Sequence, residues 1–467
     1  MSAPQPSDAL VFFGATGDLA YKQIFPALQA LVRRGALNAP IVGVAKSGWG
    51  LEQLRARAKD SLEHHGGVDP AAFDKLCSLL RYVDGDYADA ATFQKLRREL
   101  GRAERPLHYL AIPPSAFTEV IDGLAQFGCT TNARVAVEKP FGRDLASARA
   151  LNRTLHDALP EQSIFRIDHY LGKEPVLNLL YFRFANLSLE SLLDKNHVDN
   201  VQITMAESFG VQGRGKFYDE TGAIRDVIQN HVLQVVAILT MDPPVGQDVE
   251  AIREEKARIL RAIPPLDAKH VVRGQFRGYR DERGVARDST IETFAAAKLH
   301  IESWRWAGVP FFIRAGKCLP VTAFEVRVQF KRPPIDVYGE HAPSTQYFRF
   351  RIGPDVTALA LGMRVKRPGG AMVGREVELL ASEGQAGLML PYERLLGDAL
   401  RGDASLFARQ DTIEQQWRIV DPVLHLEEPP HPYEPGTWGP PETDRLVAGI
   451  PGGFREPVNP NERETSS

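Results

Sequence analysis

The stretch DALVFFGATGDLA, residues 8–20, decides the fold of the first part of the chain. Residues 8–13 end in an apolar run that favours a β-strand, and the turn GATGDLA follows directly at 14–20. Beyond it, Ile24, Leu28 and Leu31 recur at helical spacing. The predicted order is therefore a strand, a glycine turn and a helix.

Three further apolar runs follow in the first part of the chain, with helical patterns between them: IVGVA at 41–45, LHYLAI at 107–112 and ARVAVE at 133–138. Continuous apolar runs are typical of strands buried on both faces of a parallel sheet. Strands that alternate with helices predict a doubly wound parallel sheet. We therefore expect an N-terminal Rossmann-type domain over residues 1–167.

The rest of the chain has a different pattern, with strand-like stretches at 199–206, 293–301, 324–330 and 346–353. In FEVRVQF (324–330), apolar and polar residues alternate, which predicts a mainly antiparallel sheet with one face covered. An apolar helix at about 221–240 is expected to cover that face. We therefore expect a larger α+β domain over residues 168–467, ending in a loose tail from about Gly452.

Composition excludes several classes of protein. The 467 residues carry 56 Lys+Arg and 59 Asp+Glu, a net charge of −3, which disfavours a nucleic-acid partner because phosphate contacts need a basic surface. Three scattered cysteines do not form a disulfide framework or a metal cluster. The N-terminus lacks the pattern of a signal peptide, and no apolar stretch reaches the ~20 residues of a membrane span. We therefore expect a cytoplasmic protein without a membrane partner.

The glycine turn suggests a dinucleotide site. Gly14 would let the backbone approach a pyrophosphate, Gly17 would allow close packing of strand and helix, and the helix N-terminus would face the phosphates. Phe12 replaces the first glycine of the usual motif, so a purely structural turn is the alternative. After the second strand stand Lys46 and Ser47 instead of an acidic residue, which favours NADP over NAD. The alternative for Lys46 is a solvated surface lysine.

A second cluster lies in RIDHYLGKEP, residues 166–175. His169, Tyr170 and Lys173 could together donate to a phosphate, whereas a capped helix start before Pro175 is the plainer interpretation. In EKPFG (138–142), Lys139 follows another strand, at the sheet edge where open α/β sheets bind ligands. It is thus placed to reach both a cofactor and a substrate.

His231 lies in the predicted apolar helix and shares its apolar face, which is more typical of a core histidine than of a catalyst. Asp226 precedes it by five residues, about 140° around an α-helix, and so is not expected to orient it. A carboxylate from elsewhere would be needed, and Asp168 is a candidate.

Together these motifs resemble the glucose-6-phosphate dehydrogenase family. The resemblance is carried by GATGDLA, EKPFG, DHYLGKE (168–174), the block ESFGVQGRGKFYDETGAIRDVIQNH (207–231), RAGKCLP (314–320), PYERLLGDALRGD (391–403) and PGTWGP (435–440). It covers nearly the whole chain, and DHYLGKE is its most specific motif.

The resemblance implies oxidation of β-D-glucose 6-phosphate at C1 to 6-phosphoglucono-1,5-lactone, with hydride transfer to NADP. This is the first step of the oxidative pentose phosphate pathway and needs no metal. The catalytic base falls on His231 and its orienting carboxylate on Asp168. Substrate contacts fall on Lys139, His169, Tyr170, Lys173, Glu207, Asp226 and Lys317. Cofactor contacts are expected at Gly14, Ala15, Thr16, Gly17, Asp18, Leu19, Lys46, Ser47, Pro113 and Lys139. Family members also form homodimers or homotetramers.

Three positions depart from the family pattern. Gln23 and Thr322 stand where basic residues are usual, so one substrate contact and part of the phosphate affinity are in doubt. Lys46 replaces a frequent arginine and lacks its bidentate fork, which makes some use of NAD plausible. A dehydrogenase of another sugar or of unphosphorylated glucose is the alternative enzyme, because EKP after a strand also occurs in other sugar oxidoreductases. A catalytically inactive nucleotide sensor or scaffold is the alternative outside enzymes.

Overall fold

The computed structural model describes residues 5–339, 346–353, 357–383 and 389–457. The chain divides into two compact units, each assembled from separate segments. The first comprises residues 1–173, 245–253 and 389–414, and the second comprises 174–244, 254–388 and 415–467. Helices α11 (Val249–Arg261) and α13 (Gln410–Val420) contain residues of both.

The first unit is built on a six-stranded sheet in which every neighbouring pair is parallel. Its order, β3-β2-β1-β4-β5-β6, is that of the Rossmann fold and confirms the predicted doubly wound sheet. The strands are β1 (Ala9–Phe13), β2 (Ile41–Ala45), β3 (Leu80–Asp84), β4 (Pro106–Leu110), β5 (Arg134–Glu138) and β6 (Ile164–Ile167). Strand β3 was not predicted, because Arg81 and Tyr82 interrupt its apolar pattern.

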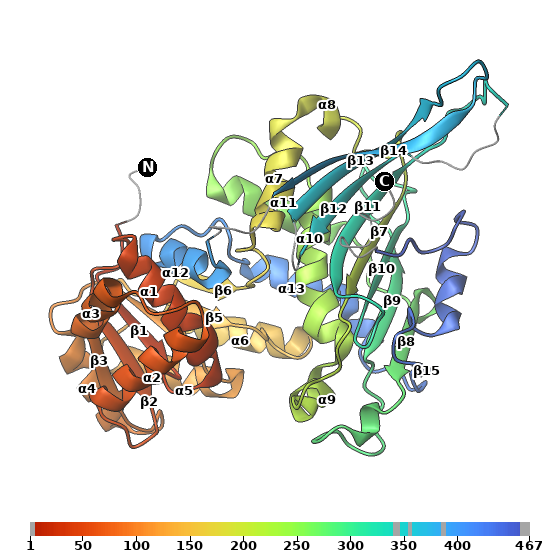
Figure 1. Ribbon diagram of the computed structural model, residues 1–467. Coiled ribbons are helices and arrows are strands. Elements are labelled where there is room, and N and C mark those ends of the chain that lie inside the picture. The colour runs from red at the N-terminus through yellow and green to blue at the C-terminus, as the bar shows by residue number, and fades with distance from the viewer. Residues whose placement is uncertain (1–4, 340–345, 354–356, 384–388, 458–467) are drawn as a thin grey trace. The chain divides into compact units, whose positions relative to one another are not determined.

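Helices cover both faces of this sheet (Figure 1). One layer is formed by α1 (Phe25–Arg33), α2 (Leu51–His64), α3 (Pro70–Leu79) and α12 (Pro391–Arg401), and the other by α4 (Ala90–Leu100), α5 (Phe117–Gln126) and α6 (Leu145–Ala158). Helix α12 lies far along the chain from α1 but packs directly on it, as the blue and red ribbons show in Figure 1. Tyr392, Leu395 and Leu396 thereby belong to the core of the first unit.

The second unit contains a nine-stranded sheet in the order β14-β13-β12-β11-β7-β10-β9-β8-β15. The pairs β7–β10 and β8–β15 are parallel and the other neighbouring pairs are antiparallel, which confirms the mainly antiparallel prediction. The strands are β7 (Val198–Ala206), β8 (Val271–Phe276), β9 (Phe294–Leu299), β10 (Phe311–Gly316), β11 (Ala323–Phe330), β12 (Tyr347–Ile352), β13 (Thr357–Lys366), β14 (Gly374–Glu383) and β15 (His431–Tyr433).

One face of this sheet is covered by helices α7 (Glu174–Ala185), α9 (Gly215–Ala223) and α10 (Leu233–Thr240), with α8 (Leu187–Glu190) beside α7. Phe182 of α7 packs edge-on against Phe348 and Phe350 of β12. Because side chains alternate along a strand, the opposite face carries polar residues. There Arg349 pairs with Glu325 and Glu378.

The predicted helical segment at 221–240 is present and contacts the sheet at β7 and β10, but it is kinked at Gly222 and its middle part, Ile224–Val232, is a π-helix instead of an α-helix. One local expectation was wrong. The expected loose tail does not begin at Gly452, because two hydrogen bonds hold the following residues to β7. The side-chain amide of Gln202 donates to Gly453 O (3.1 Å), and the backbone amide of Arg455 donates to Gln202 Oε1 (2.7 Å). Residues 458–467 of that expected tail lie outside the described part.

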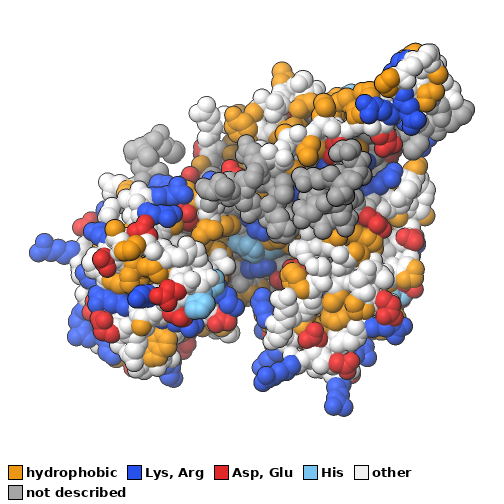
Figure 2. All heavy atoms as spheres, viewed as in Figure 1, with side chains coloured by type: hydrophobic (Ala, Val, Ile, Leu, Met, Phe, Trp, Pro, Cys, Tyr) orange, Lys and Arg blue, Asp and Glu red, His pale blue; other side chains and the backbone are white. Residues whose placement is uncertain are grey.

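Within the described ranges, no helix combines the length and the apolar character needed to cross a membrane. On the visible face of each unit, basic and acidic side chains both occur (Figure 2).

Candidate functional site

The glycine turn follows β1 as predicted. Gly14 has a φ of +77°, and its amide donates to Val44 O of the neighbouring strand (2.9 Å). A Cβ at Gly14 would lie 2.3 Å from Ala111 O, so only glycine fits between β1 and the end of β4. The same turn contains Ala15, Thr16, Gly17, Asp18 and Leu19, and Pro113 follows β4 beside it. Within this turn Gly17 and Asp18 are exposed, whereas Ala15 is buried.

At the end of β2, Lys46 is not a lone cation. Its ammonium lies 2.5 Å from Asp86 Oδ2, and this contact raises the pKa of Lys46 and lowers that of Asp86. Asp84 at the end of β3 accepts the amides of Ser47 (3.0 Å) and Gly48 (2.9 Å). Although no acidic residue directly follows β2, two carboxylates far along the chain lie beside it, one at the end of β3 and one just after β3.

Lys139 and Asp168 leave adjacent strands at the same sheet edge. Glu138 of β5 pairs with Ile167 of β6 in register, so the next residue on each strand is Lys139 or Asp168. Parallel strands bring their carboxyl ends to one edge, which is where α/β sheets bind ligands. The structure therefore brings these two predicted residues together.

The DHYLGK segment forms a tight turn. Asp168 Oδ1 accepts the amide of Tyr170 (3.0 Å), and the Lys173 ammonium lies 3.5 Å from the centroid of the Tyr170 ring. The His169 ring stacks on Tyr392 of α12, with centroids 6.4 Å apart and planes 9° apart. The turn thus presents a carboxylate, an imidazole, a phenol and an ammonium group within the first unit.

Sequence reasoning missed a buried carboxyl behind this turn. Glu138 accepts a hydrogen bond from Tyr109 Oη (2.6 Å) and also bonds to the Tyr392 side chain. Burial raises the pKa of Glu138 from 4.5 to about 7, although both phenols and Lys139 oppose the shift. The only sequence signal was an acidic residue ending an otherwise apolar strand.

In the second unit, Glu207 and Lys317 form an ion pair. They follow the parallel strands β7 and β10, and Lys317 Nζ lies 2.6 Å from Glu207 Oε2. The ammonium also lies 5.1 Å from the Phe209 ring centroid and 5.0 Å from that of Tyr218. Thr322, the departure from the family pattern, accepts the amide of Ser208 (3.0 Å) next to this pair.

Asp226 belongs to the same cluster. The negative charges of Asp226, Glu207 and Glu292 add to burial in raising the pKa of Tyr218 well above its usual value. Glu292 is buried and accepts the amide of Ile224 (3.0 Å), which fixes the start of the π-helix. The predicted substrate residues Glu207, Asp226 and Lys317 are therefore gathered around one phenol.

His231 lies in the π-helix, together with Asp226. In a π-helix, hydrogen bonds join residues i and i+5, so the residue five positions on lies about one turn along the same side. Asp226 and His231 are both in this segment, and their separation of about 140° was wrong because it assumed an α-helix. His231 is buried, and its segment contacts β7 and β10.

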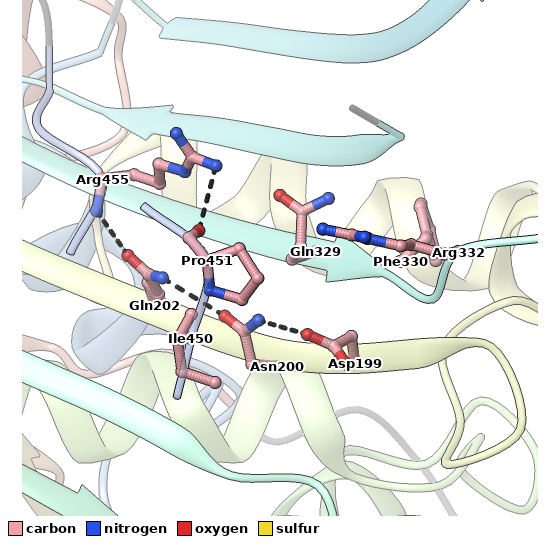
Figure 3. Close-up of a pocket in the computed structure, with 9 residues that line it drawn as sticks. All are labelled: Asp199, Asn200, Gln202, Gln329, Phe330, Arg332, Ile450, Pro451 and Arg455. Atoms are coloured by element: carbon pink, nitrogen blue, oxygen red, sulfur yellow. Dashed lines mark hydrogen bonds between the residues drawn. The ribbon is translucent and has the colours of Figure 1, made fainter. Parts of the chain in front are cut away.

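A cavity of about 250 Å³ in the second unit contains none of the predicted site residues. It lies between β7, β11 and the segment from Ile450 to Arg455 (Figure 3). Gln202 of β7 joins this strand to the C-terminal segment by accepting from the Arg455 backbone amide, and its side chain also donates to Asn200 Oδ1 (3.3 Å) on the same strand.

The strand order of the first unit and the turn at Gly14 define a protein of the dinucleotide-binding class. Comparison with known proteins then identifies the family. The family model "Glucose-6-phosphate dehydrogenase, NAD binding domain" matches residues 11–178, and "Glucose-6-phosphate dehydrogenase, C-terminal domain" matches residues 180–451. The chain belongs to the glucose-6-phosphate dehydrogenase family.

Individual relatives agree with the family models. The chain is 45% identical over 450 residues to glucose-6-phosphate 1-dehydrogenase 1 of Mycobacterium bovis, covering 95% of both chains. A solved glucose-6-phosphate 1-dehydrogenase from Mycobacterium avium has a TM-score of 0.90 at 45% identity, over 97% of this chain and all of that one. A solved glucose-6-phosphate dehydrogenase in complex with its substrate has a TM-score of 0.88 at 36% identity, over 98% and 100%.

Proposed function

We propose that this chain oxidises β-D-glucose 6-phosphate at C1 to 6-phosphoglucono-1,5-lactone and reduces NADP. The observation that carries the proposal is the 45% identity to a glucose-6-phosphate 1-dehydrogenase over 95% of both chains. It is supported by a cluster of charged side chains in each unit, formed by the residue types that this chemistry needs.

The turn after β1 fits a dinucleotide, since it lies at the carboxyl end of a central strand of the parallel sheet and its Gly17 and Asp18 are exposed. Lys46 is the proposed contact of the 2′-phosphate, and Ser47 and Pro113 flank the rest of the cofactor. When bound, NADP accepts the hydride that leaves C1. The Lys46–Asp86 pair supports some use of NAD, because Asp86 competes with the 2′-phosphate for the ammonium group.

The sugar is held by two sets of side chains in this proposal. His169, Tyr170 and Lys173 donate to its phosphate, as their concentration in one turn supports. Glu207 and Asp226 bind its hydroxyls and Lys317 adds a cation, which the ion pair of 2.6 Å and the effect of both carboxylate charges on Tyr218 support. Lys139 spans cofactor and sugar.

His231 is the proposed general base. It takes the proton of the C1 hydroxyl as the hydride leaves, and Asp168 orients its ring and stabilises the imidazolium. A positioned base contributes about 10²–10⁴-fold in rate.

The experiment is a spectrophotometric assay of the reduced nicotinamide with purified protein, glucose 6-phosphate and NADP. We expect turnover to fall at least 100-fold in His231→Asn. The control is His270→Asn, in the short turn directly before β8, and its turnover should stay within twofold of the wild type. A higher kcat/KM with free glucose would favour the alternative sugar oxidoreductase. Cofactor binding without sugar-dependent reduction would favour a sensor.

We further propose that the chain forms a homodimer or homotetramer. The side chains of Leu379 and Leu380 on the edge strand β14 are 59% and 56% exposed, and an edge strand with exposed apolar residues is suited to pair with another chain. Light scattering after size exclusion tests this proposal. A wild-type mass equal to one chain would refute it, and Leu379→Glu with Leu380→Glu should weaken the assembly.

Residues 1–167 are the proposed NADP-binding domain, on which α12 also packs, and residues 168–467 together with Lys139 bind the sugar and self-associate. The proposed location is the cytoplasm, which the free thiols of Cys77, Cys129 and Cys318 support. Cell fractionation tests the location, and recovery outside the cytoplasmic fraction would contradict it.

A further inference from the structure

Glu138 is a buried carboxyl with two phenolic partners. It ends β5, and its side chain enters the core of the first unit between Tyr109 of β4 and Tyr392 of α12. Tyr109 Oη donates to Glu138 Oε1 over 2.6 Å, and Tyr392 also bonds to the carboxyl group. The carboxyl is thus held by side chains from two elements, β4 and α12, and both phenols are themselves buried.

Charged groups of both signs act on Glu138. Lys139 follows it on the same strand, and Asp168 follows the paired strand β6. Lys139 favours the ionised carboxyl, whereas Asp168 and burial favour the protonated one. Burial is the largest effect and raises the pKa of Glu138 to about 7, within the range where an enzyme works.

Glu138 also lies beside both segments that carry the proposed substrate contacts of the first unit, because it pairs in register with Ile167, which directly precedes the DHYLGK turn. It is the neighbour of Lys139 in the chain. Its partner Tyr392 stacks on His169, and the like charge of Asp168 raises the pKa of both Glu138 and Tyr392. A change of charge on Glu138 therefore acts directly on Lys139 and Asp168.

We propose that Glu138, held by Tyr109 and Tyr392 at the end of β5, is a positioning residue whose charge controls how Lys139 binds the sugar phosphate. When Glu138 loses the proton to solvent at higher pH, the new carboxylate attracts the Lys139 ammonium and weakens binding of the sugar phosphate. The effect falls on substrate binding, since the Glu138 carboxyl is buried among protein side chains and acts through Lys139. This inference rests on the proposed function of Lys139.

The first test does not need catalysis. Infrared difference spectra between pH 5 and pH 9 record the carbonyl stretch of protonated carboxyl groups. We expect a band that titrates near pH 7 and is missing in Glu138→Gln. Asp398 on α12 is a matched control, because it is also buried with its pKa raised, to about 6, and lies outside the proposed site. Asp398→Asn should keep the band near pH 7.

The second test uses steady-state kinetics from pH 6 to pH 9. At pH 6, Glu138→Gln should resemble the wild type within about twofold, because glutamine replaces a protonated carboxyl. Above pH 7.5, KM for glucose 6-phosphate should rise about tenfold in the wild type and in Asp398→Asn but not in Glu138→Gln, with kcat within threefold throughout. Tyr392→Phe removes one hydrogen bond to the ionised carboxyl and should move the rise in KM to higher pH.

The outcomes separate this inference from the proposed function. If the wild type turns over glucose 6-phosphate and Glu138→Gln shows the same pH profile of KM, the inference is overturned and the proposed function stands. An unchanged infrared band in Glu138→Gln would overturn it whatever the substrate. If Glu138→Gln does not fold, Tyr109→Phe takes its place in the infrared test. Loss of the hydrogen bond from Tyr109 should shift the pH at which the band titrates, and an unshifted band would also overturn the inference.

Discussion

Replacement of Gly14 by alanine tests the turn on which the cofactor site depends. The residue has a φ of +77°, and an added Cβ would lie 2.3 Å from Ala111 O and 3.2 Å from Ile112 Cγ2. The first distance is shorter than a carbon and an oxygen atom tolerate, so the turn or the end of β4 must move.

The structure supplies a control for the conformational part of this cost. Gly35 has a similar φ of +71°, but a Cβ there meets nothing within 4 Å. Gly35→Ala should therefore cost only the left-handed conformation, about 1 kcal/mol in the free energy of unfolding. Gly14→Ala should cost that amount plus the strain of an overpacked contact, about 1–3 kcal/mol, for a total of roughly 2–4 kcal/mol.

The assay is urea unfolding of both variants, followed by titration of the folded proteins with NADP. We expect Gly14→Ala to lose at least 1 kcal/mol more stability than Gly35→Ala and to bind NADP at least tenfold more weakly. Gly35→Ala should bind NADP like the wild type. Equal losses of stability, or equal affinities for NADP, would refute the reasoning.

Three further predictions concern charged groups. Asp86→Asn should raise the ratio of kcat/KM with NADP to kcat/KM with NAD about threefold or more, whereas Lys46→Ala should lower this ratio. Steady-state assays with both cofactors measure it, and equal changes for NAD and NADP would show that neither residue senses the 2′-phosphate. Lys317→Gln removes the cation paired with Glu207 and should raise KM for glucose 6-phosphate about tenfold or more in the same assay, whereas an unchanged KM would remove Lys317 from the substrate site. Glu138 keeps its proton up to about pH 7 in the folded protein but only up to about pH 4.5 in the unfolded chain. The free energy of unfolding should therefore fall as the pH rises from 4.5 to above 7, by on the order of 3 kcal/mol in total from this group. Urea unfolding at pH 5 and pH 8 should show a smaller loss in Glu138→Gln than in the wild type, and equal losses would contradict the raised pKa.

Local patterns in the sequence were sufficient for the main architecture. The run 8–20 predicted a strand, a turn and a helix, and β1, the turn at Gly14 and α1 follow in that order. The alternation in 324–330 predicted the strand β11 of the larger sheet. Both features depend on residues close together in the chain, where periodicity is a direct signal.

The remaining features depend on contacts between distant residues. Asp86 reaches Lys46 only because β2 and β3 are neighbours, and β3 itself was hidden by polar residues. Tyr109, Glu138 and Tyr392 meet because α12 returns to the first unit late in the chain. No periodicity marks such contacts.

The π-helix was missed for a different reason. An apolar repeat shows that a segment is helical, but it does not distinguish i+4 from i+5 hydrogen bonding over nine residues. The predicted angle between Asp226 and His231 was wrong because it assumed the geometry of an α-helix. The prediction that both residues lie in one helical segment was confirmed.

The central claim is hydride transfer from C1 of a phosphorylated sugar to the nicotinamide of NADP. It is tested most directly by a single turnover of glucose 6-phosphate deuterated at C1, with mass spectrometry of both products. We expect the reduced cofactor to carry one deuterium and the sugar product to be the lactone without it. Reduced cofactor without deuterium, or no oxidation of the labelled sugar, would contradict the account.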